Sequence, residues 1–255
     1  RAIKDGDFYI INGQKIFTSG AEAATHVYLL VRTDPDAPKH RGISILLVPM
    51  NSPGITVRPL WTVQNDPPAP PGTTYGTPRT NETFYDNVRV PAGNLILGEG
   101  RGFEIAQGRL GPGRFQYAMM FVGMADRCLE LMCRRVEDRE AFGERLSQKT
   151  SIQHEIARSR CEIEQCRMLV LAAADKMDKY GPKEARDYIS MVKIIAPQMA
   201  LDVANRAIQA HGGAGFTQDT PLAHIYMMAR FCQVADGPDE VHMSQLARRT
   251  IRDLY

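Results

Sequence analysis

The sequence contains no C-x-x-C pair, although it has five cysteines. Four of these cysteines fall in stretches with helical periodicity, where a free thiol behaves as a small apolar core residue. Cysteines used in this way indicate a reduced, intracellular compartment rather than a disulfide-stabilised secreted protein. Bacterial cytoplasm, mitochondrion and peroxisome all remain open. The cysteines are Cys128, Cys133, Cys161, Cys166 and Cys232.

Long apolar runs and an excess of one charge are also absent. No apolar run approaches the ~20 residues of a membrane-spanning helix, so we expect no integral membrane segment. Lys and Arg number 31 against 29 Asp and Glu, a net charge of +2, which gives no reason to propose nucleic acid as a partner. The opening residues Arg1–Asp7 do not resemble a signal peptide. They lack an initiator Met and lead quickly into a strand, so we expect further sequence before residue 1.

Three common catalytic or cofactor motifs are missing. The six histidines show no metal spacing and there is no H-E-x-x-H, so no metal site is expected. No serine stands in a G-x-S-x-G context, which excludes the nucleophile elbow of a hydrolase. The cluster Gly212-Gly213-Ala214-Gly215 follows a predicted helix and lacks G-x-G-x-x-G spacing, so it is not a Rossmann fingerprint. Taken alone, it would be a helix C-cap and turn.

The first part of the chain is rich in short β-type runs separated by turn residues. Asn12-Gly13 follows the first run directly and is the strongest short hairpin signal. Residues 65–72 contain consecutive prolines and predict an exposed loop. Several short strands of this kind indicate a small antiparallel sheet or barrel. The predicted strands are 8–11, 26–31, 43–48, 55–58 and 83–88.

After Gly102 the apolar residues recur with a period near 3.6. Pro112 suits the first turn of the first predicted helix, and Gly181-Pro182 separates the second from the third. Pro197 predicts a kink inside the third helix. Long helices joined by short turns favour an antiparallel bundle. The predicted helices are 112–138, 151–179, 183–210, 219–232 and 239–253.

The sequence therefore predicts an α+β protein. An antiparallel β-barrel or sandwich domain, residues 1–95, is followed by a C-terminal four-helix bundle, residues 96–255.

Six segments match, in order and approximate spacing, the pattern of the acyl-CoA dehydrogenase family, which the chain resembles over its whole length. Leu110–Arg114 and Ala235–His242 are most similar to the branch that contains human members 10 and 11. The family has three domains, of which only the middle β domain and the C-terminal bundle are covered. The segments are 9–20, 88–98, 100–114, 138–143, 209–216 and 236–237.

The resemblance implies FAD-dependent α,β-desaturation of an acyl-CoA thioester. A base removes the α-proton while the β-hydrogen leaves as hydride to flavin N5. The family stabilises the thioester oxygen with hydrogen bonds, one of them from backbone N–H beside the base. A carboxylate suits the role of base if burial raises its pKa.

Asp236 occupies the place of that base, where most of the family has Glu. The structural alternative is that Asp236 caps the last helix, a common role for Asp. Asp239 and Glu240 could compete as bases, but they fall in the first turn of that helix, where acids complement the dipole. A minority of the family places its base at the position of Gly113, which has no side chain.

Further site residues follow from the resemblance. Arg114 lies beside the catalytic carboxylate, with a structural ion pair as the alternative. Leu110, Gly113, Arg114 and Gly237 are expected to line the substrate site. For FAD, Phe17, Thr18 and Ser19 match the segment that packs on the isoalloxazine ring. Arg139 and Phe142 match a segment that reaches the FAD of a neighbouring subunit, and the remaining expected FAD contacts are Gln209, Gly212, Gly213, Pro238 and Glu240.

Partners and rival functions also follow from the resemblance. The implied partners are an acyl-CoA substrate, an electron-transfer flavoprotein as acceptor, and copies of the same chain in a tetramer or dimer. One rival is an acyl-CoA oxidase, which has the same fold but is reoxidised by oxygen. The other is a non-catalytic subunit or fragment that needs a partner for the uncovered N-terminal domain.

Overall fold

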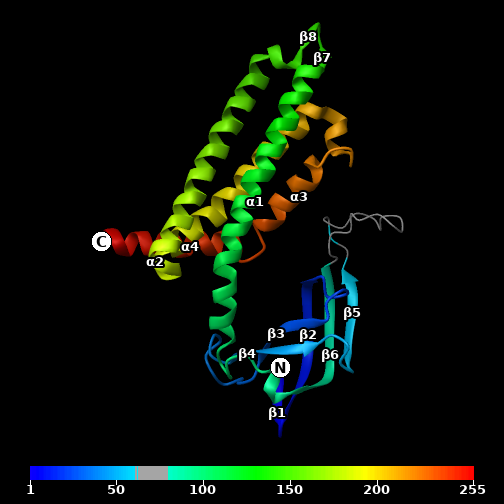
Figure 1. Cartoon of the computed structure of the whole chain (residues 1–255), viewed down its shortest axis with the longest axis vertical. Coiled ribbons are helices and arrows are strands. Elements are labelled where there is room, and N and C mark those ends of the chain that lie inside the picture. The colour runs from blue at the N-terminus through cyan, green and yellow to red at the C-terminus, as the bar shows by residue number, and fades with distance from the viewer. Residues whose placement is uncertain (61, 63–79) are drawn as a thin grey trace. The chain divides into compact units, whose positions relative to one another are not determined.

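The computed structural model describes residues 1–60, 62 and 80–255, which form two compact units, Arg1–Arg109 and Leu110–Tyr255 (Figure 1). Helix α1, Gly102–Asp138, contributes residues to both units. The loop predicted at residues 65–72 lies outside the described residues. The domain boundary predicted after residue 95 stays a prediction.

The first unit is built on antiparallel strands, as the sequence predicts. One sheet has the order β1–β2–β6–β5, with strands at Ala2–Asp5, Phe8–Ser19, Thr80–Pro91 and Ile55–Leu60. A second sheet pairs β3, His26–Arg32, with β4, Ile43–Pro49. A single 3-10 turn at Ala92–Asn94 follows β6.

The two sheets share one apolar core. Alternate residues of β2 and β6 are buried, as expected for strands with one face inward. They join residues of β3 and β4 in a single cluster, so the unit is a β-sandwich. The cluster includes Tyr9, Ile11, Leu29, Val31, Leu46, Val48, Val88 and Val90.

The hairpin predicted at Asn12-Gly13 is wrong. Strand β2 continues through both residues, and its pairing with β6 shifts register between Ile11 and Gly13, which marks a β-bulge. The Asn12 amide donates to Asn87 Oδ1 at 3.1 Å and its oxygen accepts the Asn87 N–H at 2.8 Å. The Asn12 side chain is thus hydrogen-bonded to the neighbouring strand instead of to the backbone of a turn. The first hairpin turns instead at Gly6, whose φ is 58°.

Helix α1 begins ten residues before the predicted start. Pro112 therefore lies inside the helix rather than in its first turn. Residues 102–111, which precede Pro112, are rich in glycine, and glycine weakens both the helix propensity and the apolar pattern of this segment. Gly102 allows the helix start to approach β4 closely, since a Cβ there would lie 2.9 Å from the Ile43 carbonyl oxygen.

The second unit is a helical bundle, and its longest element folds back on itself. Helix α2, Thr150–His211, is broken at Gly181, where φ is 79° and ψ is 178°. The break separates the two helices predicted from the sequence, and Figure 1 shows the chain reversing there. Backbone dihedrals within α2 stay helical at Pro197. A small hairpin precedes α2 and consists of β7, Glu140–Ala141, and β8, Glu144–Arg145. A 3-10 turn, Leu146–Gln148, connects this hairpin to α2.

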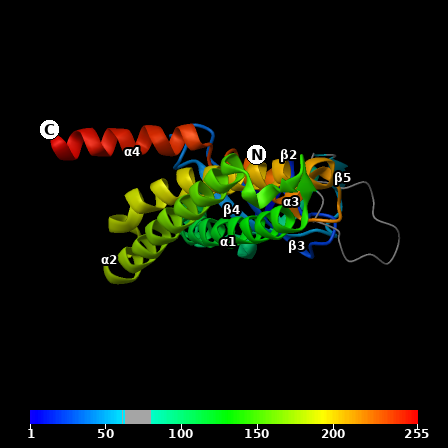
Figure 2. The same cartoon turned by 90° about the horizontal axis from the view of Figure 1, so that it is seen from above.

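Two shorter helices complete this unit. A 3-10 turn, Gly212–Phe216, leads to α3, Leu222–Cys232, and α4, Asp239–Leu254, ends the chain. Residues from α1, both halves of α2, and α3 form one core. The buried residues of α4 are Asp239 and His242, both near its start. Figures 1 and 2 show the C-terminal end of α4 projecting from the bundle.

Candidate functional site

The turn between α3 and α4, Gln233–Pro238, has an unusual backbone. Asp236 has a φ of 54°, a left-handed conformation that costs most residues about 1–2 kcal/mol and is least unfavourable for Asp, Asn and Gly. Gly237 follows with a φ of 96°. The N–H of Asp239 closes the turn by donating to the Gln233 carbonyl at 3.0 Å. Such conformations persist where surrounding contacts hold them.

Two side chains from other elements hold the middle of this turn. The Arg114 guanidinium, from α1, donates to the Asp236 carbonyl through Nη2 at 3.0 Å and Nε at 3.3 Å. His242, from the first turns of α4, meets the same oxygen through Nε2 at 3.3 Å. Arg114 therefore does lie beside Asp236, but it binds the backbone of that residue rather than its carboxylate.

The carbonyl contact fixes the state of His242. Because the Asp236 oxygen can only accept, Nε2 must carry the proton. Burial lowers the pKa of His242, and the hydrogen bond to Asp236 only partly offsets this. His242 is therefore a neutral Nε2–H donor at neutral pH. Burial likewise lowers the pKa of Arg114, while the charge of Asp236 acts in the opposite direction.

The helix-capping alternative for Asp236 is wrong. The N-cap of α4 is Pro238, and no side-chain hydrogen bond caps this helix. Asp236 is half-buried, and among the described residues its carboxylate has no hydrogen-bond or ion-pair partner. The side chain is thus left free for a ligand. Its role as a base stays a prediction.

Asp239 lies in the first turn of α4, as the sequence predicts, and it also has a partner that the sequence does not indicate. Its carboxylate accepts a hydrogen bond from Lys193 of α2 at 2.6 Å, and their side chains are only 13% and 6% exposed. Asp239 is therefore committed to a buried ion pair and is a poor competitor of Asp236. The sequence does not reveal Lys193 as the partner of Asp239, because the two residues are 46 positions apart and no motif connects them. Glu240 is exposed.

Of the remaining expected substrate residues, Gly237 lies in this turn, and Leu110 and Gly113 lie near Arg114 on α1. Gly237 could not be replaced without strain, since a Cβ there would lie 3.0 Å from His242 Nε2. Gly113 precedes Arg114 on α1, and Leu110 lies one helical turn before Arg114. Space around Gly113 is open. The second unit thus brings together Arg114, Asp236 and Gly237, with Pro238 and Glu240 at the start of α4.

The predicted isoalloxazine segment lies in the first unit, at the end of β2. Pairing with β6 shifts register between Lys15 and Thr18, so that Phe17 bulges out of the strand. Phe17 has a φ of 64° and is 69% exposed. A left-handed aromatic residue is uncommon, and such strain is typical of binding sites. Thr18 and Ser19 rejoin the ladder opposite Asn81 and Thr80.

Arg139 and Phe142 lie at the β7–β8 hairpin, at the upper end of the second unit (Figure 1). Phe142 and Gly143 form the turn with φ values of 58° and 81°, and the Phe142 ring is 96% exposed. Arg139 is also exposed. The structure does not bring these two residues to the Asp236 turn.

The glycine cluster ends the second half of α2. Gly212 is the C-cap with a φ of 63°, and its N–H donates to Gln209 and Ile208 carbonyls. Gly212 and Gly213 are exposed, and Gly213 has open space where a Cβ would stand. The cluster is therefore the C-cap that the sequence pattern suggests, and it also presents bare backbone to solvent.

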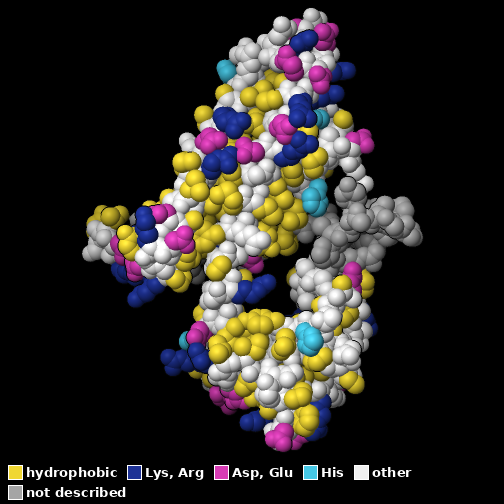
Figure 3. Space-filling view, in the orientation of Figure 1, with side chains coloured by type: hydrophobic (Ala, Val, Ile, Leu, Met, Phe, Trp, Pro, Cys, Tyr) yellow, Lys and Arg dark blue, Asp and Glu magenta, His cyan; other side chains and the backbone are white. Residues whose placement is uncertain are grey.

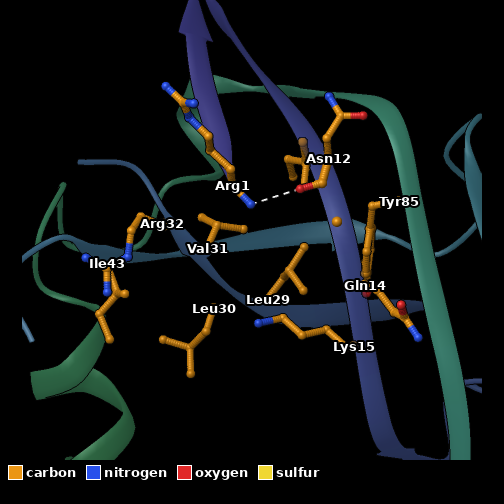
Figure 4. A pocket seen from close by; sticks show the side chains of 12 residues that line it. Arg1, Asn12, Gln14, Lys15, Leu29, Leu30, Val31, Arg32, Ile43 and Tyr85 are labelled. Carbon is orange, nitrogen blue, oxygen red and sulfur yellow. Dashed lines mark hydrogen bonds between the residues drawn. The ribbon is translucent and has the colours of Figure 1, made fainter. Parts of the chain in front are cut away.

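The first unit contains a cavity of about 300 Å³ between β2 and β3. Figure 4 shows the Lys15 side chain extending from β2 toward Leu29 and Leu30 of β3. Burial lowers the pKa of Lys15. The β2 residues of the lining end at Lys15, before Phe17, so none of the predicted site residues lines this cavity.

Three further observations concern surface charge, membrane spans and metal binding. On the face drawn in Figure 3, basic and acidic side chains are interspersed over the second unit. None of the described helices combines the length and the apolar character that a membrane span requires. Within the described ranges, no group of three or more His, Cys, Asp or Glu could hold a metal ion.

Comparison with known proteins identifies the family. The family model for the acyl-CoA dehydrogenase C-terminal domain matches residues 100–251, and that for the middle domain matches residues 1–69. Acyl-CoA dehydrogenase family member 10 of Mus musculus is 48% identical over 99% of this chain, and member 11 of Rattus norvegicus is 45% identical over 98%. The chain spans only 23% and 32% of these two relatives. The resemblance to the branch of members 10 and 11 is thereby confirmed.

Solved structures agree. The crystal structure of acyl-CoA dehydrogenase from Geobacillus kaustophilus matches 98% of this chain at a TM-score of 0.88 and 31% identity, and the chain covers 63% of it. Both the β-sandwich and the helical bundle are thus accounted for by one known architecture. With 152 of 255 residues inside the C-terminal family model alone, the chain belongs to the acyl-CoA dehydrogenase family.

Proposed function

We propose that this chain forms the middle and C-terminal domains of an FAD-dependent acyl-CoA dehydrogenase in which Asp236 is the catalytic base. The observation that carries the proposal is the Asp236 turn. Its backbone is held by Arg114 and His242 while its carboxylate has no partner among the described residues. Family membership supplies the reaction class, and the turn supplies the residue.

The residues of the predicted flavin site fit such a group. Phe17 offers an exposed aromatic face beside two hydroxyl side chains, which suits a flat ring system with polar edges. Exposed backbone at Gly212 and Gly213 allows close approach of a nucleotide. Arg139 could give two parallel hydrogen bonds to a pyrophosphate. FAD, when bound, would accept the β-hydrogen of the substrate as hydride.

The chain's own residues would perform the proton transfer. The Asp236 carboxylate would accept the α-proton of the thioester. Arg114 and His242 keep the turn in its left-handed conformation by occupying the Asp236 carbonyl.

The same arrangement leaves a donor for the substrate. The N–H of Asp236 has no acceptor among the described residues, and Pro238 has no N–H to offer. A thioester oxygen placed at the Asp236 N–H would be stabilised as negative charge develops on it. Leu110, Gly113 and Gly237 would then line the acyl group. Electrons would pass to an electron-transfer flavoprotein, and the hairpin of Arg139 and Phe142 would serve a neighbouring copy in a dimer or tetramer.

The experiment is an anaerobic absorbance titration of the full-length protein with a long-chain acyl-CoA. We expect the flavin absorbance of the wild type to bleach. Asp236→Asn should keep its flavin and reduce it about a hundredfold more slowly or worse, the usual loss when a general base is removed. The matched control is Asp253→Asn, an exposed Asp at the other end of α4, which should bleach like the wild type.

The outcomes separate the alternatives. Bleaching of Asp236→Asn at the wild-type rate would reject Asp236 as the base. A wild type without flavin would instead favour a non-catalytic subunit. Rapid reoxidation by oxygen without an added acceptor would indicate an oxidase rather than a dehydrogenase.

A further inference from the structure

A buried ion pair ties the end of the Asp236 turn to the core of the bundle. Lys193 lies in the second half of α2, within a stretch whose neighbours Val192, Ala196 and Pro197 are buried apolar residues. Its Nζ atom donates to Asp239 Oδ1 at 2.6 Å. Asp239 is the first residue of α4 and stands three residues after Asp236. The pair thus connects the first residue of α4 to the second half of α2.

Burying such a pair is not an efficient way to stabilise a protein. Removing two charges from water costs nearly as much as their attraction returns, and well-packed apolar residues often stabilise a fold equally well. The side chains here are 6% and 13% exposed, so the desolvation is nearly complete. What an ion pair provides beyond apolar packing is a fixed distance and direction between two defined atoms.

The ion pair between Lys193 and Asp239 is one of several side-chain contacts that hold the α3–α4 turn. The Asp236 carbonyl is held from α1 by Arg114 and from α4 by His242, while Asp239 is held from α2 by Lys193. The N–H of Asp239 closes the turn on Gln233. Side chains from α1, α2 and α4 therefore all contact the segment from Asp236 to Asp239. None of these contacts involves the Asp236 carboxylate, which has no partner in the described part of the chain.

We propose that Lys193 and Asp239 are positioning residues for Asp236: their buried ion pair holds the start of α4 so that the turn presents its carboxylate free. The proposal rests on the proposed function of Asp236 as base. Both side chains are nearly fully buried, and each acts through the backbone of the turn.

The test replaces the pair in the full-length protein. Lys193→Met with Asp239→Leu removes both charges and fills the space with apolar atoms, so the fold should survive. We expect hydrogen exchange of the amides between Gln233 and His242 to accelerate at least tenfold without any substrate present. We also expect flavin reduction by acyl-CoA to slow at least tenfold at saturating substrate, with KM changed little, because a misplaced base affects the chemical step.

The matched control removes a second tie between the same two helices. Arg249 of α4 pairs with Asp187 of α2 and donates to Ser190 Oγ at 3.0 Å, ten residues beyond Asp239. Arg249→Met with Asp187→Leu should lower thermal stability yet leave exchange in the turn and flavin reduction at wild-type values. A general loosening of α4 would affect both double variants alike.

The inference is overturned if the Lys193→Met, Asp239→Leu variant matches the wild type in turn exchange and in flavin reduction. It is also overturned if the Arg249→Met, Asp187→Leu variant changes them equally. Failure of the proposed function is a separate result: Asp236→Asn would then stay active, while the exchange measurement would still decide the role of the pair.

Discussion

His242 makes the α3–α4 turn sensitive to acid. Its pKa lies below the ordinary value of 6.5 because burial disfavours the charged ring. In the unfolded chain the imidazole binds a proton more readily, so the unfolded state holds more protons in this window. The contribution of His242 to stability is therefore complete above pH 6.5 and declines as the pH falls below it.

This loss can be measured by comparing variants. The free energy of unfolding of the wild type, followed by denaturant titration between pH 5 and 8, should fall toward acid more steeply than that of His242→Gln. Glutamine keeps an N–H donor for the Asp236 carbonyl but cannot take up a proton. His154→Gln, which replaces an exposed histidine on α2, is the control and should follow the wild type. Identical pH dependence in all three proteins would show that His242 is not the cause.

Single residues differ in how far the sequence alone predicts their role. Asp236 and Arg114 could be found because they stand in motifs with fixed neighbours, and the structure does bring them together. Lys193 could not be found, because a pair separated by 46 residues depends on how α2 folds back at Gly181. Asp239 lies in the first turn of the last helix, as the sequence predicts, but its burial against Lys193 could not be found from the sequence.

At the scale of elements, Gly181 determines the shape of α2. Its φ of 79° and ψ of 178° lie in a region that only glycine adopts readily. Gly181→Ala should therefore destabilise the protein by about 1–3 kcal/mol, although no atom lies within 4 Å of the added Cβ. Gly123→Ala is the matched control, because Gly123 is exposed within α1 and has equally open space. That change should stabilise the protein, by up to about 1 kcal/mol.

Denaturant titration at neutral pH measures both changes. Equal effects of the two substitutions would mean that the backbone at Gly181 is free to become helical and that α2 need not reverse there. A fall in stability confined to Gly181→Ala would confirm that the backbone conformation itself, rather than packing, is what alanine disrupts.

The elements were predictable where periodicity is strong and not where special backbone geometry decides. Strands 26–31 and 43–48 fall within β3 and β4, and the break between the two halves of α2 was predicted at Gly181-Pro182. Asn12-Gly13 was misinterpreted because a β-bulge and a hairpin turn favour the same residue types. The predicted start of α1 is too late because three glycines, Gly102, Gly108 and Gly111, weaken the helical pattern before Pro112.

At the scale of the whole molecule, all five cysteines lie in the second unit, so thiol labelling reports on that unit alone. Burial raises the pKa of Cys128 to about 12 and the pKa of Cys166 and Cys232 to about 11. A thiol with such a pKa is almost never ionised at neutral pH, and the thiolate is the reactive form. Cys133 and Cys161 are exposed.

We therefore expect iodoacetamide at pH 8 to label Cys133 and Cys161 in the native protein and all five cysteines in denaturant, as read by mass spectrometry of peptides. The three buried thiols belong to the same core, which unites α1, α2 and α3. They should become reactive together as denaturant is raised, because one core unfolds as one unit. Labelling of Cys232 well before Cys128 would show instead that α3, and with it the Asp236 turn, opens independently of the bundle. In that case the contacts from Arg114 and Lys193 would not be strong enough to hold the turn, and the positioning role inferred for Lys193 and Asp239 would lose its support.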